Sequence, residues 1–233
     1  MTAIPLQRDD VYYPESDGKP MAETEIHVEE TIYLLVALKD RYRDAQDVYV
    51  GGDMFLYYVE GDPKKVVAPD VFVVPGVPKR KRRIYKLWEE GRPPALIVEV
   101  TSADTRKEDL GRKKALYERL GVAEYILYDP LGDYLSPRLQ GFRLIGGQYE
   151  PVPHSAKNSL ESRTVGLTFQ MEGSQLRLID TATGTLLLRD EEVRELARTA
   201  EERARTVEER ARAAEEEAAR LRAELERLRN QGT

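Results

Sequence analysis

The stretch Ala95-Leu-Ile-Val-Glu-Val100 decides the fold class of this 233-residue chain. It is a short, nearly continuous apolar run of strand length, the pattern of a central β-strand that is covered on both faces. One acidic residue, Glu99, interrupts the run. A carboxylate in a buried strand is costly unless it is paired, hydrogen-bonded or bound to a metal. Glu99 is therefore the first candidate for a functional residue.

The residues before this strand predict one helix and three further strands. Between Glu23 and Arg43 the apolar residues recur on one side of a helix. Three short strands follow, separated by glycine- and proline-containing turns, and they resemble a meander. These strands are predicted at Val48–Val50, Met54–Val59 and Val71–Val74. Residues 1–22 have turn chemistry without a sustained period and predict an extended N-terminal arm.

The residues after the central strand continue the alternation of helix and strand. Thr101 and Ser102 offer capping oxygens for a helix that ends at Gly121. Residues 124–128 predict the next strand, and short β segments between 142 and 179 are expected at a sheet edge. The sequence therefore predicts one α/β domain over residues 23–189.

Residues 190–233 follow a different pattern. Their apolar residues alternate in spacings of four and three over more than four heptads, surrounded by Glu and Arg, which predicts a coiled-coil tail. The seam consists of Val193, Ala197, Ala200, Ala204, Val207, Ala211, Ala214, Ala218, Leu221, Leu225 and Leu228. Such a tail would join copies of the chain into a homo-oligomer or bind a partner helix. The alternative is a single solvated helix held by Glu–Arg pairs, because alanine buries little area.

The composition excludes several classes of protein and site. The chain has no cysteine, which excludes a disulfide framework, a zinc ribbon and a thiol nucleophile. With two histidines, His27 and His154, a multi-histidine metal site is excluded as well. The net charge of −6 argues against a histone-like nucleic-acid binder. Without a membrane-length apolar run or an export signal, we expect a cytoplasmic protein that does not span a membrane.

Three polar residues are candidates for catalysis. Asp70 follows Pro69 and opens a strand, Glu99 interrupts the central strand, and Lys113 lies on the following helix. Two carboxylates that converge at strand ends form a hard oxygen site suited to Mg²⁺ or Mn²⁺, and a lysine nearby would stabilise negative charge or help to activate water. The alternative is structural: a turn cap, a buried ion pair and a surface charge. The residues alone leave both interpretations open.

An ordered set of five motifs carries a resemblance to a known family. The motifs are Pro69-Asp70, Glu99, Thr101-Ser102, Asp109-x-Gly111-x-Lys113-x-x-x-Tyr117 and Gly121-Val122-x-Glu124-Tyr125-x-x-x-Asp129-Pro130. Over about residues 23–151 they resemble the bacterial putative restriction endonuclease family of the PD-(D/E)XK nuclease superfamily. The resemblance implies a restriction-endonuclease-like α/β core, with a central mixed sheet between helices, and Mg²⁺-dependent cleavage of DNA phosphodiester bonds.

The resemblance also implies roles for individual residues. Asp70 and Glu99 match the two metal-binding acids, and the backbone carbonyl of Val100 is implied as a further ligand of Mg²⁺, for which Mn²⁺ can substitute. The superfamily lysine stands two residues after the second acid, where this chain has Thr101. Lys113 matches a lysine that this family supplies from the following helix. The expected activity is that of a metal-dependent endodeoxyribonuclease.

Other polar residues have weaker predictions. A basic run is a candidate DNA-contacting loop, or else a solvated loop of charge. The run consists of Lys79, Arg80, Lys81, Arg82 and Arg83. Auxiliary site groups could come from His27, Glu30 and Glu60, although a surface or core-edge role is favoured for each. Packing and helix-to-strand contacts are predicted for Tyr117, Glu124 and Tyr125, and Tyr117 is also a candidate to line the site.

The relocation of the lysine leaves a second function open. A nuclease-fold core with Thr101 at the usual lysine position could have lost catalysis. It would then serve as a nucleic-acid-binding or protein-binding module that the coiled coil oligomerises.

Overall fold

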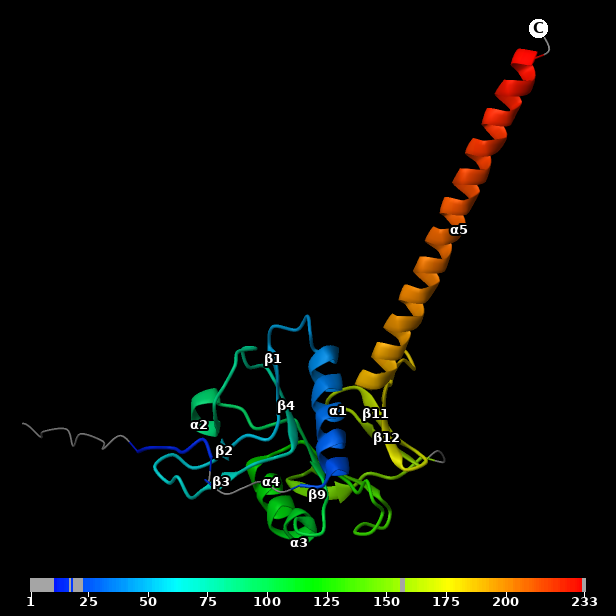
Figure 1. Ribbon diagram of the computed structural model, residues 1–233. Coiled ribbons are helices and arrows are strands. Elements are labelled where there is room, and N and C mark those ends of the chain that lie inside the picture. Colours follow the sequence, from blue (N-terminus) through cyan, green and yellow to red (C-terminus); the bar gives the residue numbers. More distant parts are fainter. Residues whose placement is uncertain (1–10, 17, 19–22, 156–157, 232–233) are drawn as a thin grey trace, which may run out of the picture. The chain divides into compact units, whose positions relative to one another are not determined.

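The computed structural model describes residues 11–16, 18, 23–155 and 158–231. These residues form two compact units, one that extends to Leu187 and one that begins at Leu188. The first unit is a mixed α/β unit, and the second contains one long helix (Figure 1). Most of the predicted N-terminal arm lies outside the described residues.

A six-stranded mixed sheet forms the centre of the first unit. Its strand order is β1-β4-β6-β7-β8-β9, with β6 and β7 parallel and the other neighbours antiparallel. The strands are β1 (Val48–Gly51), β4 (Val71–Pro75), β6 (Leu96–Val100), β7 (Glu124–Tyr128), β8 (Leu139–Ile145) and β9 (Gln148–Pro151). The parallel pair requires a crossover, which the helical segment between β6 and β7 provides. The apolar run that decides the fold class is β6, an interior strand.

Both faces of this sheet are covered, as the composition of β6 predicts. All five residues of β6 are buried. Leu96, Val98 and Val100 belong to one hydrophobic cluster and Ile97 belongs to the other, because successive side chains of a strand point to opposite faces. Glu99 therefore shares its face of the sheet with Ile97.

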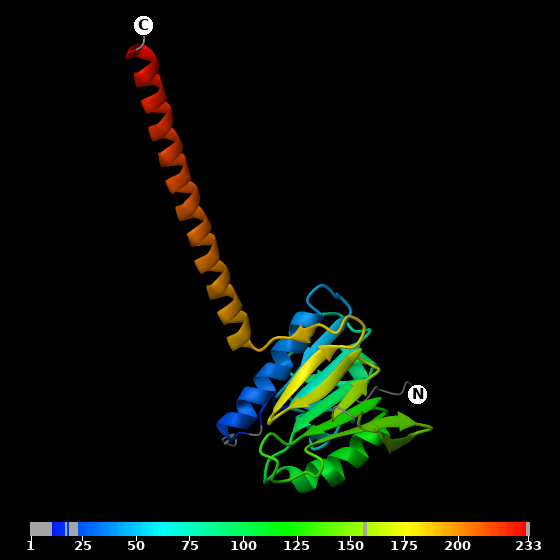
Figure 2. The ribbon, with the colours of Figure 1, turned by 90° about the vertical axis from the view of Figure 1, so that its right-hand side faces the viewer.

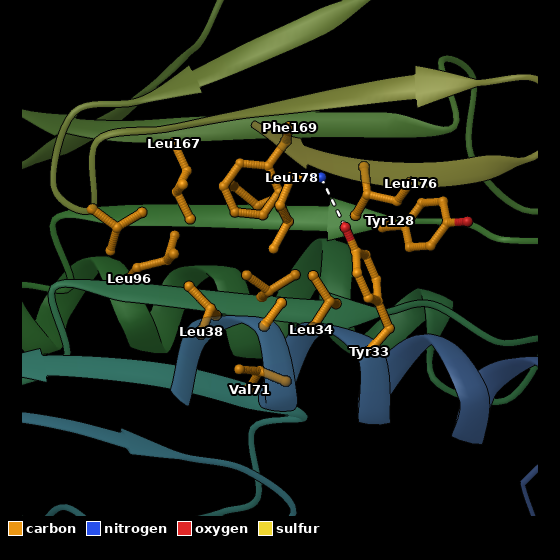
Figure 3. Close-up of a cluster of buried hydrophobic side chains, with 14 of the residues drawn as sticks. Tyr33, Leu34, Leu38, Val71, Leu96, Tyr128, Leu167, Phe169, Leu176 and Leu178 are labelled. Carbon is orange, nitrogen blue, oxygen red and sulfur yellow. Dashed lines mark hydrogen bonds between the residues drawn. The ribbon is translucent and has the colours of Figure 1, made fainter. Parts of the chain in front are cut away.

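Helix α1 (Glu25–Arg41) and a second sheet cover the first face (Figure 2). The second sheet contains β10 (Ser159–Ser162), β11 (Leu167–Glu172), β12 (Gln175–Asp180) and β13 (Leu186–Leu187), in that order. Figure 3 shows Leu34 and Leu38 of α1 in one cluster with Phe169 and Leu178 of this sheet. The Tyr33 hydroxyl accepts a hydrogen bond from Leu178 N at 3.0 Å and donates one to Leu187 O at 3.1 Å.

The expectation that the later β segments lie at a sheet edge is only partly right. β8 and β9 do extend the edge of the main sheet, but β11 and β12 belong to the separate second sheet. The reason is that β11 buries alternate residues, and these are packed with Leu176 and Leu178 of β12 in the cluster that includes α1. A half-buried antiparallel sheet of this kind forms a layer of its own.

A helical segment and a small third sheet cover the second face. The helical segment consists of α3 (Arg106–Glu108), a π-helical turn η1 (Asp109–Lys113) and α4 (Lys114–Leu120). The third sheet, in the order β3-β2-β5, consists of β3 (Val66–Val67), β2 (Leu56–Tyr57) and β5 (Tyr85–Lys86), and the short helix α2 (Leu87–Glu90) follows it.

The predicted meander is wrong, because β1 pairs directly with β4 and β2 lies in the third sheet. The turn after β1 explains the difference. A Cβ on Gly52 would lie 2.5 Å from the carbonyl oxygen of Asp70, so the chain needs glycine there. Asp53 follows with a positive φ of 47°. The left-handed conformation at Asp53 directs the chain away from the main sheet.

The second unit contains helix α5 (Asp190–Gln231). The helix is continuous, and acidic residues in its first turn complement the helix dipole. Its apolar side chains are exposed in a single chain, with Val207 65% and Leu225 68% exposed. None of the described helices is both long enough and apolar enough to cross a membrane.

Glu124 is a buried polar anchor between the main and second sheets, rather than the helix-to-strand contact that we predicted. Its carboxylate accepts hydrogen bonds from Arg143 Nε at 2.8 Å and from Thr164 Oγ1 at 2.7 Å. Further donors are the Ser162 hydroxyl and the Arg163 amide. Burial acts to raise the pKa of Glu124, but these hydrogen bonds outweigh it and lower the pKa.

We predict that Glu124→Gln lowers the free energy of unfolding by about 3 kcal/mol, because the buried donors lose a charged acceptor. Since the pKa of Glu124 is lowered in the folded state, its stabilisation exists above the ordinary carboxyl pKa and disappears as the pH falls through the folded-state pKa. The denaturation curves of variant and parent should therefore converge at low pH. The matched control is Glu161→Gln, an exposed residue of β10. Equal stability of Glu124→Gln and Glu161→Gln at neutral pH would contradict the role of Glu124 as a polar anchor between the two sheets.

Candidate active site

The register of two strands brings Asp70 and Glu99 together. Val71 of β4 pairs with Val98 of β6, so Asp70, one residue before β4, lies opposite Glu99. Asp70 N donates a hydrogen bond to Glu99 Oε2 at 3.3 Å, and Val100 N donates one to Asp70 Oδ2 at 2.7 Å. The Asp70 side chain is 22% exposed and that of Glu99 is 1% exposed. The pair thus has one buried acid and one that solvent reaches.

The π-helical turn supplies the third predicted residue. Lys113 Nζ lies 3.1 Å from Glu99 Oε2 and 3.0 Å from Asp109 Oδ1. The lysine side chain is only 12% exposed, so it is not a surface charge. At the usual lysine position, Thr101 has a buried hydroxyl without a hydrogen-bond partner among the described residues. In this structure, Lys113 is the lysine that contacts the acid.

Two residues that we did not select as catalytic hold this cluster in place. The Tyr117 hydroxyl donates to Glu99 Oε1 at 2.7 Å, so both carboxylate oxygens of Glu99 are engaged. Tyr117 thus contacts the site directly and does more than fill the core. Asp109 holds the opposite side of the Lys113 ammonium. Its signal in the sequence was the spacing of four residues to Lys113, which places two residues on one side of a helix.

The electrostatics of the cluster reflect three acids around one lysine. Burial raises the pKa of Glu99 to about 8, and the negative charges of Asp70 and Asp109 act in the same direction. Burial also raises the pKa of Asp109. For Lys113, burial acts to lower the pKa, but the surrounding carboxylates outweigh it and raise the pKa. Lys113 is therefore a cation at neutral pH, and the site has an excess of negative charge.

His27 of α1 approaches the same cluster from the other face of the sheet. Its Nε2 lies 3.5 Å from Asp70 Oδ2, and its Nδ1 lies 3.7 Å from Glu23 Oε2. Burial acts to lower the pKa of His27, but the hydrogen bond to Asp70 and the nearby negative charges raise it. A cavity of about 90 Å³ lies beside His27 and Thr101.

The other two auxiliary candidates, Glu30 and Glu60, differ in burial. Glu30 is buried on α1, one turn after His27, whereas Glu60 is exposed after β2. Asp53, which the sequence analysis missed, lies near Asp70: burial and then the charge of Asp70 raise the pKa of Asp53. Its approach depends on the left-handed turn after β1, which has no periodic signal in the sequence.

The donor set suits a hard divalent cation. Within the described ranges, no three or more His, Asp and Glu side chains are arranged to hold a metal ion. Asp70 and Glu99 supply two neighbouring carboxylates, and Mg²⁺ usually keeps several waters on one or two carboxylates. Burial is the largest cause of the raised pKa of Glu99, and the charges of Asp70 and Asp109 add to it. The residues present are thus compatible with Mg²⁺ or Mn²⁺.

Two members of the basic run have structural roles. Lys79 Nζ donates to the carbonyl oxygens of Tyr42 and Arg43 at 2.6 Å each and ties the loop to the end of α1. The Arg82 side chain is 1% exposed and pairs with Glu90. Its guanidinium carbon also lies 4.2 Å from the centre of the Tyr49 ring. The structure therefore does not offer the five cations as one solvated cluster.

The remaining members of the run are exposed. Arg80 pairs with Glu90 at 2.8 Å, and Arg83 pairs with Glu15 at 2.6 Å. Lys81 is exposed between them in the chain. Lys81 and Arg80 are therefore the members of the run best placed to meet a large ligand at this loop.

A groove of about 600 Å³ lies along β1, the edge strand of the main sheet. Its lining comes from the end of α1, from β1 and the turn after it, and from the basic loop: Lys39, Tyr42, Val48, Tyr49, Val50, Gly51, Gly52, Met54, Lys79, Arg80, Lys81 and Arg82. At one end, Gly52 packs against the carbonyl of Asp70. Neither Asp70 nor Glu99 is among the lining residues, so the groove approaches the acid pair only through the backbone of Asp70.

Known proteins similar to this chain include one solved structure and one protein family. None of the curated proteins matches the chain. A crystal structure of a putative nuclease belonging to DUF820 from Anabaena variabilis is similar to it, with 14% identity and a TM-score of 0.46 over 63% of this chain and 76% of that one. A family model described as Uma2, putative restriction endonuclease, matches residues 3–174. The match covers most of the first unit, and the chain belongs to the Uma2 family of putative restriction endonucleases.

Proposed function

We propose that this protein is a Mg²⁺-dependent endonuclease that hydrolyses DNA phosphodiester bonds at a site built from Asp70, Glu99 and Lys113. The observation that carries the proposal is their convergence: three separate segments of the chain bring two acids and a lysine into direct contact. Membership of a family of putative restriction endonucleases supports DNA as the substrate. A buried ion pair alone would not require the partly exposed Asp70 beside it.

The side chains have distinct tasks in this proposal. Asp70 and Glu99 hold the cation, with the Val100 carbonyl as a further ligand. When bound, Mg²⁺ would make the attacking water more acidic and neutralise charge on the phosphate. Because its pKa is raised, Lys113 keeps its proton at neutral pH, so it acts as a hydrogen-bond donor to a phosphate oxygen or to water and not as the base.

Neighbouring residues keep these groups in position. Tyr117 fixes Glu99 through Oε1, which leaves Oε2 directed toward Asp70 N and Lys113. Asp109 orients the ammonium of Lys113. This support is what a catalytic cluster requires, since small displacements of reacting groups are costly in rate.

The groove along β1 is the proposed path of a DNA strand. Two of its exposed cations, Lys39 and Lys81, can neutralise backbone phosphates, which supply much of the affinity of proteins for DNA. Its Gly52 end adjoins Asp70, so a strand in the groove would place a phosphodiester near the acid pair. We also propose that α5 associates with a second helix through its exposed apolar seam.

We predict that Glu99→Gln weakens Mg²⁺ binding and reduces DNA cleavage at least about hundredfold, because it removes an anionic ligand and keeps the side-chain shape. In the parent, the proton on Glu99 competes with the cation below its pKa of about 8, so Mg²⁺ affinity should rise with pH toward that value. The rise of Mg²⁺ affinity with pH should be much smaller in Glu99→Gln than in the parent. Isothermal titration with Mg²⁺ and a cleavage assay with Mg²⁺, Mn²⁺ or EDTA measure both effects.

The matched control is Glu150→Gln, an exposed residue at the sheet edge, which should bind Mg²⁺ and cut DNA like the parent. Cleavage by Glu99→Gln at the parental rate would overturn the assignment of the metal site. DNA binding without Mg²⁺ binding or cleavage in the parent would instead support the inactive binding module.

We predict that Lys113→Met reduces turnover about hundredfold and keeps binding of both Mg²⁺ and DNA, because the donor acts on the transition state. Single-turnover cleavage measures the rate, and thermal unfolding verifies the fold. The control Lys107→Met removes an exposed lysine of α3 and should leave turnover unchanged. Parental turnover of Lys113→Met would leave Lys113 with a purely structural ion pair.

We predict that replacing Lys39 and Lys81 by Gln weakens DNA binding and lowers the slope of log K against log salt concentration by about one for each phosphate that is no longer neutralised. The measurement is fluorescence anisotropy in a Glu99→Gln background, so that the DNA is not cut. Arg83→Gln is the control, since Arg83 is exposed but does not line the groove. An equally large effect in the control would indicate a general charge effect and contradict the groove as the DNA path.

A further inference from the structure

Helix α5 carries a binding face that the chemistry of the first unit does not explain. The face is a heptad seam, with Ala197, Ala204, Ala211, Ala218 and Leu225 at the a positions and Val193, Ala200, Val207, Ala214, Leu221 and Leu228 at the d positions. In a single chain, Val193, Val207, Leu221 and Leu225 are each about half exposed or more. An exposed apolar stripe on an otherwise charged helix indicates a surface that another helix covers.

The charges beside this seam identify the other helix. At the g positions, the residues change along α5 from Arg203 and Arg210 to Glu217 and Glu224. At the e positions, they change in the opposite sense, from Glu208 and Glu215 to Arg222 and Arg229. Flanking charges of this kind set the choice and orientation of the partner in coiled coils.

A parallel, in-register copy of α5 matches these charges. In that arrangement, each g residue meets the e residue five positions further along on the other helix. The contacts are Arg203 with Glu208, Arg210 with Glu215, Glu217 with Arg222, and Glu224 with Arg229. All four are between opposite charges, and twofold symmetry forms each of them twice.

Other arrangements of two α5 helices oppose like charges. A parallel pair shifted by one heptad places Arg210 against Arg222. An antiparallel pair with the full seam overlapped brings e positions together, with Glu208 against Glu215 and Arg194 against Arg229. Its remaining contacts are between opposite charges, so it combines attraction and repulsion, whereas the four contacts of the in-register parallel pair are all attractive. Like charges at such contacts disfavour the wrong register and orientation.

Several charges on the outer side of α5 have partners within the helix. Arg198 pairs with Glu195 and Glu202, and Arg205 pairs with Glu209, at the b and f positions. These outer charges therefore stabilise the helix within one chain.

We propose that α5 forms a parallel, in-register, two-stranded coiled coil with α5 of a second copy of this chain. The alanines at the a positions favour two strands, because such small side chains would leave the centre of a wider bundle unfilled. This inference rests on the association of α5 proposed above and is independent of nuclease activity. Two first units are then joined to the same end of one coil.

Introduced cysteines test the direction and register of the helices in the full-length chain. The chain has no cysteine, so Ala197→Cys and Leu225→Cys, made separately, each introduce one thiol at an a position. Under mild oxidation, each variant should form a disulfide-linked dimer with itself. Glu209→Cys, at an outward f position, is the control and should not. Disulfide formation only when the two variants are mixed would show an antiparallel coil and overturn the inference.

Charge reversal tests the pairing that we infer. The double variants Glu208→Arg/Glu215→Arg and Arg203→Glu/Arg210→Glu should each dimerise at least about tenfold more weakly than the parent, and an equimolar mixture should regain parental affinity as a heterodimer. Sedimentation equilibrium measures both. A monomeric or trimeric parent, or a mixture no tighter than its components, would overturn the inference. DNA cleavage by the parent is assayed separately, so a failure of the proposed nuclease function remains distinguishable.

Discussion

The burial of one carboxylate in the central strand is the constraint on which the rest of the site depends. Glu99 lies in the middle layer of the protein, where an ionised group requires compensation. The compensation comes from Lys113, from the Tyr117 hydroxyl and from the Asp70 amide. The helical segment positions Lys113 and Tyr117, and the register of β4 positions the Asp70 amide. The placement of both elements is therefore tied to Glu99. Burial nevertheless raises the pKa of Glu99 to about 8, so these partners offset only part of the cost of ionising it.

The features that could be predicted from the sequence were those whose pattern lies within a single helix or strand. The apolar run of β6, the one-sided apolar pattern of α1 and the heptads of α5 each reflect burial or period along a single element. Asp70 and Glu99 were recognisable for the same reason, since each interrupts or opens an apolar strand. Membership of the Uma2 family agrees with the α/β core that these patterns predict.

The pairing of distant segments was harder to predict. The sequence does not show that β1 skips its neighbour in the chain to pair with β4, because that choice depends on the close approach of Gly52 to the Asp70 carbonyl. It also does not separate Arg82, which is buried against Tyr49, from the exposed Lys81 one position earlier. Asp109 was part of a motif, but its role depends on Lys113 turning inward at the π-helical turn. In each case a tertiary contact decided between interpretations that look equal along the chain.

The short connection between the two units has a consequence for how such an assembly would act on DNA. β13 ends at Leu187 and α5 begins at Asp190, so little chain separates the first unit from the proposed coil. Two copies joined this way would hold their acid sites at a high effective concentration relative to each other. Once one copy binds a DNA molecule, the encounter of the second copy with that molecule becomes intramolecular. Avidity would then favour a long substrate that reaches both copies over a short fragment that fills only one.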